Sequence, residues 1–344
     1  MLFKFSFVFY NADLSYKYTK QFMVCFPNAK INIGLNIVEK RPDGFHTVES
    51  ILYPVGLCDI LEVVSTDEAA GLARFKSTGL AIPGGAENNL CVKAYELLSK
   101  EHVLPGVNIH LHKIIPIGAG LGGGSSDGAF FVKLLNDKFE LGLSWGELHH
   151  YARQLGSDCS FFIGNRPAYA EGIGDQFEPT GVQLSGYHLV IVYPAIHIST
   201  AEAYSRVKPQ KPERTLETVI DGLSPENWKP VIKNDFEDSA FRVYPLLRDI
   251  KDKLYKLGAV YASMSGSGSS VYGLFKTEKG TAGAGAAEAT EATEADKFKK
   301  EFDGFFCMGR GSPISPLNSP ILERAFSFCV ASTAFEINSL RNIS

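Results

Sequence analysis

Strands are indicated at five places by alternating polar and apolar positions or by short apolar runs. They lie at residues 24–37, 51–64, 107–116, 187–194 and 258–275, the last interrupted by a loop of glycine and serine. Apolar residues at helical spacing predict helices that begin at Asn89 and at Ser125, and a third over residues 145–156, where Gly156 is placed to end it. This mixture predicts an α+β fold with two layers in each half of the chain.

The length and composition are those of a two-domain globular protein. The chain has 344 residues, 45% of them hydrophobic and 12% aromatic, which is enough to bury a sizeable core. We expect a poorly packed extension over residues 1–23, an N-terminal domain over 24–170, a C-terminal domain over 171–310 and an atypical tail over 311–344. Residues 281–296, TAGAGAAEATEATEAD, are a low-complexity insert that is either an exposed linker or a marginal helix.

Charge and cysteine usage exclude several classes of function. The 34 basic and 38 acidic residues give a net charge of −4, so electrostatic attraction to nucleic acid or anionic lipid is not the main activity. No apolar run approaches the ~18 residues that a membrane-spanning helix needs. The six cysteines form no C-x-x-C pair, which favours reduced thiols and a cytoplasmic location. We expect neither nucleic acid nor membrane as a partner, with a weak N-terminal export signal left open.

The densest glycine cluster stands between a predicted strand and a predicted helix. It holds Pro116, Gly118, Gly120, Gly122, Gly123, Gly124, Ser125 and Ser126. Glycine lets the backbone take positive φ angles, and successive N–H groups at a helix N-terminus attract an anion, so the segment predicts a phosphate site. The segment is not a P-loop, because glycine follows Gly123 where a lysine is required. A dinucleotide fingerprint fits Gly118, Gly120 and Gly123, but no acidic residue ends a strand about 20 residues later, which weakens the nicotinamide-dependent oxidoreductase alternative.

Three segments in order resemble the GHMP kinase superfamily. They are Pro27-Asn-Ala-Lys30-Ile-Asn32, the glycine-rich segment 116–126, and Ser265-Gly-Ser-Gly-Ser-Ser270. The stretch KINIGLNIVEKRPDGFH, with LGSDCSFF at 155–162 and AYAEGIGD at 168–175, is similar to one branch of that superfamily. The substrate of that branch is 4-diphosphocytidyl-2-C-methyl-D-erythritol, in the non-mevalonate route to isoprenoid precursors. The resemblance covers about residues 24 to 310, without the insert.

The resemblance implies a fold, a reaction and its reactants. The fold is α+β, with a ribosomal-protein-S5-like N-terminal domain and a ferredoxin-like α/β C-terminal domain. The reaction is ATP-dependent phosphorylation of the 2-hydroxyl of a small-molecule substrate, a cytidine diphosphate sugar alcohol, with ATP and Mg²⁺ as the cofactors and a monomer or homodimer as the assembly. Another small-molecule kinase, of the mevalonate or homoserine type, and a catalytically silent nucleotide-binding homologue remain as alternatives.

Two catalytic residues follow from the same resemblance. Asp158 is the implied general base, because an ordinary aspartate is ionised at neutral pH and can accept a proton. Lys30 is expected beside it, where an ammonium keeps the carboxylate ionised and stabilises the developing alkoxide. The alternatives are an aspartate at a turn and a lysine that extends from a strand. Cys159 and Ser160 stand where the family commonly has valine and proline, a departure that bears on the loop geometry.

The resemblance also implies which residues bind the two reactants. The glycine-rich segment from Pro116 to Ser126 binds ATP phosphates, Asn89 contacts adenine, and the hydroxyl of Ser125 or of Ser126 is available to a metal whose ligands remain undetermined. The substrate side is implied for Asn32 at the methylerythritol hydroxyls, Phe45 stacked on cytosine, His46 at the cytosine edge, Tyr204 as the opposite wall, and Gly266, Ser267 and Gly268 at the diphosphate. Taken singly, the aromatic residues fit a packed core, and the last three fit an ordinary hairpin.

Overall fold

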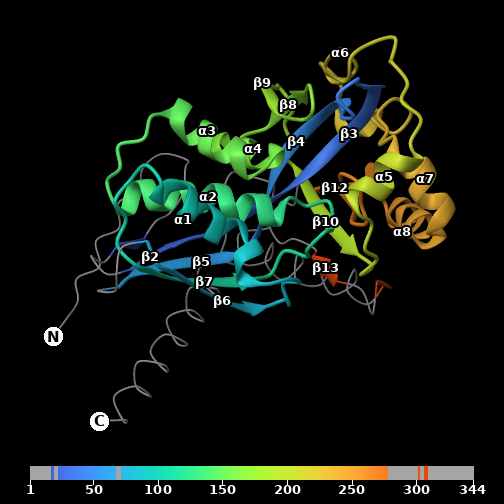
Figure 1. Cartoon of the computed structure of the whole chain (residues 1–344). Helices are drawn as coiled ribbons and strands as arrows, with labels where there is room; N and C mark the ends of the chain where they lie inside the picture. Colours follow the sequence, from blue (N-terminus) through green and yellow to red (C-terminus); the bar gives the residue numbers. More distant parts are fainter. Residues whose placement is uncertain (1–16, 19–21, 67–70, 278–300, 303–305, 309–344) are drawn as a thin grey trace.

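The structure, a computed structural model, describes most of the chain between residues 17 and 308 (Figure 1). The described residues are 17–18, 22–66, 71–277, 301–302 and 306–308. The expected low-complexity insert at 281–296, the tail at 311–344 and most of the expected N-terminal extension lie outside them. No helix in the described part of the chain is long and apolar enough to cross a membrane.

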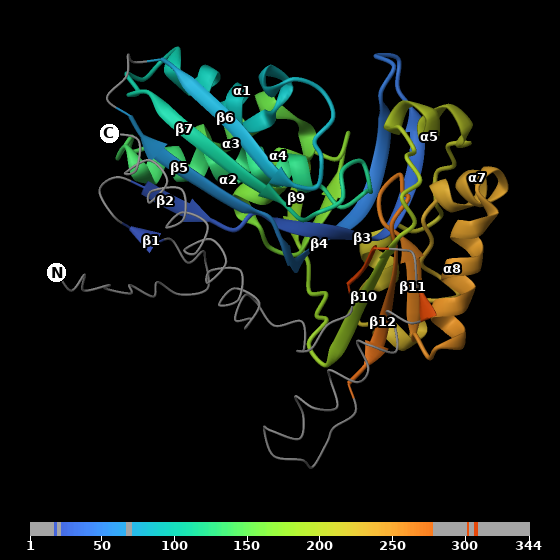
Figure 2. The same cartoon turned by 90° about the horizontal axis from the view of Figure 1, so that it is seen from below.

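The N-terminal half is a five-stranded sheet with helices packed on one face (Figures 1 and 2). In sheet order the strands are β1 (Lys17–Tyr18), β2 (Phe22–Cys25), β5 (Ile60–Ser65), β7 (Val107–Lys113) and β6 (Ala73–Gly79). The helices are η1 (Ala86–Asn88), α1 (Leu90–Ser99), α2 (Gly123–Lys138), α3 (Trp145–Leu155) and α4 (Ser157–Gly164). Only β6 and β7 pair in parallel, and the other neighbours are antiparallel.

The alternation in β7 decides which face of this sheet the helices cover. Val107, Ile109, Leu111 and Lys113 are buried, whereas the residues between them are at least partly exposed. The buried row packs with the apolar residues of α1 and α2 in one core. Because β7 ends against this core and α2 begins in it, the glycine-rich connection between them is held at both ends.

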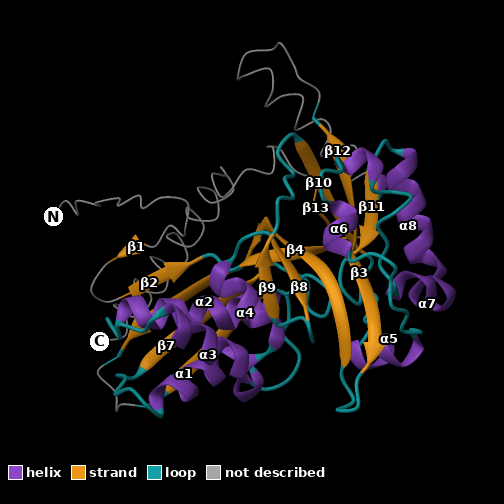
Figure 3. Cartoon of the chain, turned by 90° about the horizontal axis from the view of Figure 1, so that it is seen from above, coloured by secondary structure: helices purple, strands orange, loops and turns teal. Residues whose placement is uncertain are grey.

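A long hairpin connects the two halves of the molecule (Figure 3). It belongs to a four-stranded antiparallel sheet with the order β3 (Asn28–Lys40), β4 (His46–Cys58), β8 (Ala168–Glu171) and β9 (Gln176–Pro179). The turn after β3 is closed by a hydrogen bond from the Arg41 N–H to the Phe45 carbonyl at 2.8 Å. The expected domain boundary at residue 170 falls inside β8, so we propose that the N-terminal unit extends to Pro179.

The C-terminal half is a second layered unit (Figure 2). Its sheet has the order β11 (Tyr261–Met264), β12 (Val271–Lys276), β10 (Tyr187–Tyr193) and β13 (Phe306–Met308). Its helices are α5 (Thr200–Arg206), α6 (Leu216–Ile220), η2 (Pro225–Asn227), α7 (Phe236–Val243) and α8 (Pro245–Lys256). In β10, Val190 and Val192 pack in the core under α7 and α8, and Leu189 and Ile191 pack in the core shared with β3. Both faces of this strand are therefore buried, which explains its continuous apolar run.

The structure confirms the two-layered α+β organisation and corrects some strand limits. The single strand expected over residues 24–37 is two strands, interrupted where the Pro27 carbonyl accepts the Asp59 N–H at 2.8 Å. The strand expected over 51–64 is likewise divided at Asp59 into β4 and β5. In both cases the two pieces pair with different sheets, which apolar patterning along one segment does not reveal.

Candidate active site

A cavity of about 1090 Å³ lies where the hairpin, the N-terminal helices and the C-terminal unit meet. Its walls come from β3, the turn between β3 and β4, the loop before α2, the start of α4, the β10–α5 connection and the loop between β11 and β12. Pockets for one small ligand are commonly about 300–1,000 Å³, so this cavity is at the large end of the range for a binding site. All three segments singled out in the sequence contribute to its lining.

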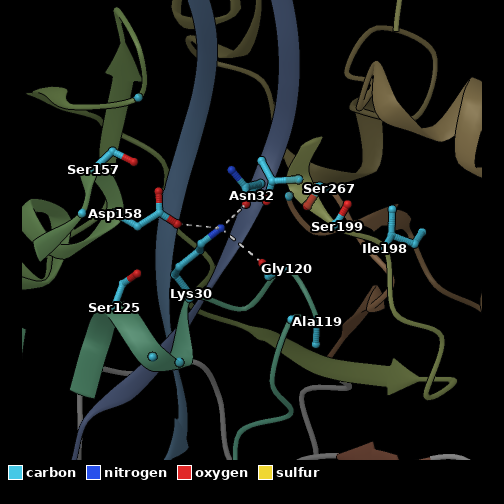
Figure 4. Close-up of a pocket in the computed structure, with 18 of the residues that line it drawn as sticks. Lys30, Asn32, Ala119, Gly120, Ser125, Ser157, Asp158, Ile198, Ser199 and Ser267 are labelled. Carbon is cyan, nitrogen blue, oxygen red and sulfur yellow. Dashed lines mark hydrogen bonds and ion pairs between the residues drawn. The ribbon is translucent and has the colours of Figure 1, made fainter. Parts of the chain in front are cut away.

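Lys30 stands at the centre of this cavity, although the residue is only 4% exposed (Figure 4). Its Nζ donates a hydrogen bond to Asn32 Oδ1 at 2.6 Å and another to the Gly120 carbonyl at 3.2 Å. It also forms an ion pair with Asp158 Oδ2 at 3.7 Å. Burial lowers the pKa of the Lys30 ammonium, and the charge of Asp158 partly opposes that shift. The ammonium is thus anchored before any substrate arrives.

Asp158 reaches Lys30 from the first turn of α4. The preceding Gly156 both ends α3 and precedes α4, so the expected loop at Asp158 is a helix start. A carboxylate is favourable near a helix N-terminus. The Asp158 side chain is 40% exposed, in contrast to the 6% of Lys30, so it faces the open part of the cavity. Cys159 and Ser160, the departure from the family pattern, are buried behind it inside α4.

The glycine-rich loop lines the cavity and packs directly against the Gly-Ser loop between β11 and β12. Gly118, Gly120 and Gly122 have φ angles of 64°, 77° and 71°, which non-glycine residues rarely adopt. At Gly120 a side chain is also excluded by space, because a Cβ would lie 1.9 Å from the Ser265 carbonyl oxygen. The first hydrogen bond within α2 runs from the Ser126 N–H to the Gly122 carbonyl at 2.9 Å. The N–H groups of the turn before it are left for a ligand, as expected at an anion site.

An aromatic wall closes the other end of the cavity. His46 stacks on Tyr204 with ring centroids 4.6 Å apart and planes at 25°, and Tyr204 meets Phe236 edge-on at 5.0 Å. Phe45, in the turn before β4, is 60% exposed and lines the same cavity. Burial lowers the pKa of His46, which favours a neutral imidazole, and burial raises the pKa of Tyr204 to about 12. One face of Tyr204 is therefore covered by His46. The expected arrangement has Tyr204 opposite Phe45 across the cytosine and His46 at the edge of the base, and it stays a prediction.

A buried charge cluster supports the glycine-rich loop, and two of its members, Lys113 and Asp127, also line the cavity. Lys113 Nζ bonds Asp59 Oδ2 at 2.5 Å and Asp127 Oδ2 at 2.6 Å, and all three side chains are at most 3% exposed. Asp59 Oδ1 also accepts the backbone N–H groups of Ile114 and Ile115, just before the loop. Burial alone lowers the pKa of Lys113, but the two carboxylates outweigh it and raise that pKa. Burial raises the pKa of Asp127 well above its ordinary value.

Fourteen of the residues expected at the site from the sequence line the cavity, in addition to Lys30 and Asp158. They are Asn32, Phe45, His46, Asn89, Pro116, Gly118, Gly120, Gly122, Gly123, Gly124, Ser125, Tyr204, Gly266 and Ser267. Asn89 also caps α1 by accepting the Cys91 N–H at 2.9 Å. Ser126 and Gly268 do not line it: Ser126 is 0% exposed, and Gly268 packs against Met264.

The sequence interpretation missed residues that hold the site together over long range. Asn234 Nδ2 donates to the carbonyls of Met264 and Gly266, both at 2.8 Å, and Glu237 Oε1 accepts the Met264 N–H at 2.8 Å. The available signal was Asn-Asp-Phe-Glu at residues 234–237, a pattern typical of a helix N-terminus, which names no distant partner. For Lys113 the signal was a charge at an apolar position of an alternating strand. His197, which lines the cavity beside Gly118, had no signal of its own.

The donors around the loop fit a divalent cation that is held mainly by a nucleotide. Among the described residues no group of three histidine, cysteine or acidic side chains is placed to hold a metal unaided. Mg²⁺ usually takes one or two protein oxygen ligands and completes its shell with phosphates and water. The Ser125 hydroxyl and the Asp158 carboxylate are hard oxygen donors that line one cavity, whereas the Ser126 hydroxyl is buried without a partner among the described residues (Figure 4). Nothing in the sequence favoured the hydroxyl of Ser125 over that of Ser126 as a metal ligand, whereas exposure to the cavity favours Ser125.

Family models recognise both halves of the chain. The model described as GHMP kinases N terminal domain matches residues 89–166, and that described as GHMP kinases C terminal matches residues 220–292. Both models describe the GHMP kinases, and the two-domain fold and the cavity between its halves agree with that class. A homoserine kinase from Cytophaga hutchinsonii shares this fold, with a TM-score of 0.57 at 16% identity over 88% of this chain and 98% of its own.

More similar relatives narrow the class. The 4-diphosphocytidyl-2-C-methyl-D-erythritol kinase of Bacteroides thetaiotaomicron is 52% identical over 256 residues, which cover 74% of this chain and 93% of the relative. A crystal structure of 4-(cytidine 5'-diphospho)-2C-methyl-D-erythritol kinase has a TM-score of 0.66 at 28% identity, over 83% of this chain and 98% of its own. The chain belongs to the 4-diphosphocytidyl-2-C-methyl-D-erythritol kinase family of the GHMP kinases.

Proposed function

We propose that this chain transfers the γ-phosphoryl group of ATP to the 2-hydroxyl of 4-diphosphocytidyl-2-C-methyl-D-erythritol. The observation that carries this proposal is the pair of Lys30 and Asp158, 3.7 Å apart in one cavity whose walls offer an anion site and an aromatic site. Family membership supports the choice of acceptor. The fold alone does not, because kinases of other small molecules share it.

The residues divide the reaction among them. The N–H groups of the loop and of the first turn of α2 bind the phosphates, and the turn carrying Phe45 with Tyr204 holds the cytosine end. The Asp158 carboxylate takes the proton of the acceptor hydroxyl, and the hydroxyl oxygen bonds to the γ-phosphorus. At the same time the bond from the γ-phosphorus to the β–γ bridging oxygen breaks, and ADP leaves. Lys30 offers a fixed positive charge beside the developing alkoxide.

Mg²⁺ is part of the proposal. When bound together with ATP, this ion would neutralise negative charge on the β- and γ-phosphates. Ser125 is the residue that would hold it, because its hydroxyl lines the cavity at the start of α2, which leaves Asp158 free to act as the base. The amide oxygen of Asn32 accepts a hydrogen bond from Lys30, and its Nδ2 donates one to Ser50. In this arrangement the main role of Asn32 is to orient Lys30, and contact with the substrate is secondary.

Turnover with defined acceptors tests the proposal. The purified chain with ATP and Mg²⁺ is expected to form ADP with the cytidine substrate and not with mevalonate, homoserine or galactose. Asp158→Asn should lower kcat by about 100-fold to 10,000-fold, the usual contribution of a general base, with ATP binding retained. Asp249→Asn, on the exposed side of α8, is the matched control and should behave as wild type.

Each alternative has its own result in this assay. Turnover of another acceptor in place of the cytidine compound would reject the substrate and keep the kinase class. ATP binding without turnover of any acceptor would indicate a catalytically silent homologue. Unchanged kcat in Asp158→Asn would remove Asp158 as the base.

A further inference from the structure

The hydroxyl of Ser265 lies at the junction of all three sequence segments. Ser265 is 0% exposed and follows β11 directly. Its Oγ donates a hydrogen bond to the Gly120 carbonyl at 2.8 Å and accepts the backbone N–H of Asn32 at 3.2 Å. One side chain thus joins the Gly-Ser loop to the glycine-rich loop and to β3, across 145 and 233 residues of sequence.

Both hydrogen bonds of the Ser265 hydroxyl end on partners of Lys30. The Gly120 carbonyl oxygen accepts from Ser265 Oγ and also from Lys30 Nζ at 3.2 Å. The other hydrogen bond of the ammonium goes to the side chain of Asn32, the residue whose backbone N–H bonds Ser265. The third neighbour of Lys30, the carboxylate of Asp158, has no direct bond to Ser265 among the described contacts. Ser265 therefore acts on the lysine from one side only, the side away from the base.

The loop that carries Ser265 is itself fixed on both sides. Asn234 holds the carbonyls of Met264 and Gly266, and Glu237 accepts the Met264 N–H. Asn234 is 2% and Glu237 is 7% exposed, so these bonds are shielded from water. The backbone on both sides of Ser265 is therefore fixed in place, and the hydrogen bond from the Ser265 hydroxyl in turn fixes the carbonyl of Gly120.

We propose that Ser265 is a positioning residue for phosphoryl transfer: its hydroxyl holds the Gly120 carbonyl and Asn32 where they fix the ammonium of Lys30. The inference rests on the proposed function, in which Lys30 acts beside the acceptor. Ser265 does not line the cavity, so it acts through Lys30 and does not touch the reactants. Small displacements of a catalytic group are costly, because about 1 Å of misplacement can reduce a rate about 100-fold.

A double-mutant cycle tests this coupling. Ser265→Ala is expected to lower kcat by about 10-fold to 100-fold while the KM values for ATP and for the acceptor change by less than about threefold. In a Lys30→Met background the same change should have almost no further effect, because coupled residues are non-additive. An undiminished loss of kcat in the Lys30→Met background, or a wild-type kcat in Ser265→Ala, would overturn the proposal.

A matched serine separates positioning from simple stability. Ser269 is in the same loop, is 0% exposed, and donates its hydroxyl to the Ile196 carbonyl, away from Lys30. Ser269→Ala should lower the thermal midpoint about as much as Ser265→Ala, but its loss of kcat should stay additive with Lys30→Met. If the two serine variants lose the same kcat and both losses are additive, Ser265 is only structural.

A measurement without substrate keeps the test independent of the proposed reaction. In protein labelled with ¹⁵N-lysine, the Nζ resonance of Lys30, identified by its loss in Lys30→Met, should move in Ser265→Ala and stay in place in Ser269→Ala. An unmoved resonance in Ser265→Ala contradicts the positioning role whatever the chain phosphorylates. Failure of the wild-type chain to phosphorylate the cytidine substrate, with the resonance moved, would instead contradict only the proposed function.

Discussion

Lys30 and Lys113, the two buried lysines among the described residues, should differ strongly in how much stability is lost on replacement by methionine. Lys30 and Lys113 are 4% and 2% exposed, so burial alone does not distinguish them. Their partners do. Lys113 is bonded to Asp59 and Asp127, whose side chains are 0% and 3% exposed, whereas the acidic partner of Lys30, Asp158, is 40% exposed.

The magnitudes follow from what each change leaves behind. Lys113→Met leaves two carboxylates without their ammonium away from water, and breaking a buried ion pair costs about 3–5 kcal/mol. At roughly 2–4 °C per kcal/mol for a cooperative unit of about 150–250 residues, the size of the N-terminal unit that holds the cluster, the thermal midpoint of that unit should fall by about 6–20 °C. The backbone N–H bonds to Asp59 and the raised pKa of Asp127 favour the lower part of this range.

Lys30→Met should cost little stability. Asp158 is solvated once the ammonium is gone, so no unpaired charge stays buried, and the cost of keeping the ammonium away from water is removed. The buried Asn32 amide oxygen loses its partner, at a cost of about 1–3 kcal/mol. These contributions nearly cancel, so the thermal midpoint should change by only a few degrees while kcat falls by at least about 100-fold.

Calorimetry and urea unfolding of both variants, with initial rates of ADP formation, measure these effects. Lys113→Arg, which keeps the charge in the same cluster, is the control for loss of charge as opposed to loss of shape. Equal thermal midpoints for Lys113→Met and wild type would refute the view that the cluster stabilises the fold. If the thermal midpoint falls as far in Lys30→Met as in Lys113→Met, the solvent exposure of the acidic partner does not determine the cost of removing the lysine.

Further predictions concern the substrate wall, the loop and pH. Phe45→Ala removes an exposed ring that contributes little to the core, so KM for the cytidine substrate should rise by about 5-fold to 150-fold, the equivalent of ~1–3 kcal/mol of base stacking, with KM for ATP unchanged in the same assay. Gly120→Ala places a Cβ against the Ser265 carbonyl and should abolish ATP binding or folding, whereas Gly124→Ala, with nothing within 4 Å, should keep the wild-type melting temperature. Because burial lowers the pKa of Lys30, kcat should fall on the alkaline side at a pH below the ordinary 10.5 of a lysine; a pH–rate profile whose alkaline limb is the same in Lys30→Arg would contradict this assignment.

What the sequence predicts best is what is local within it. The glycine-rich loop, the turn before Phe45 and the strand–loop–strand around Gly266 each lie within a short stretch, and the structure has them where the patterns indicate. The proximity of Lys30 to Asp158 followed only from the family resemblance, because spacing along the chain does not state which strand faces which helix.

Local sequence patterns do not predict the long-range interactions that hold the site together. Ser265 and Asn32 are 233 residues apart, and Asp59 and Lys113 are 54 apart, so no periodicity connects them. A lysine at a buried position of β7 requires an oppositely charged partner, but the apolar pattern does not show where in the sequence that partner lies. Such pairs arise from tertiary packing, which decides the strand breaks at Pro27 and Asp59 as well.

The placement of α2 divides the cavity into a rigid side and an adaptable one. This helix carries the nucleotide end of the site and is buried against the sheet and the neighbouring helices, so its interior amides exchange with solvent only through opening of the whole N-terminal core. The turn at residues 41–45 is mostly exposed and belongs to none of the hydrophobic clusters of the described residues, so we expect its amides to exchange more readily. We therefore expect the proposed acceptor to enter and leave past the hairpin tip, while α2 keeps the proposed phosphate donor in a fixed position.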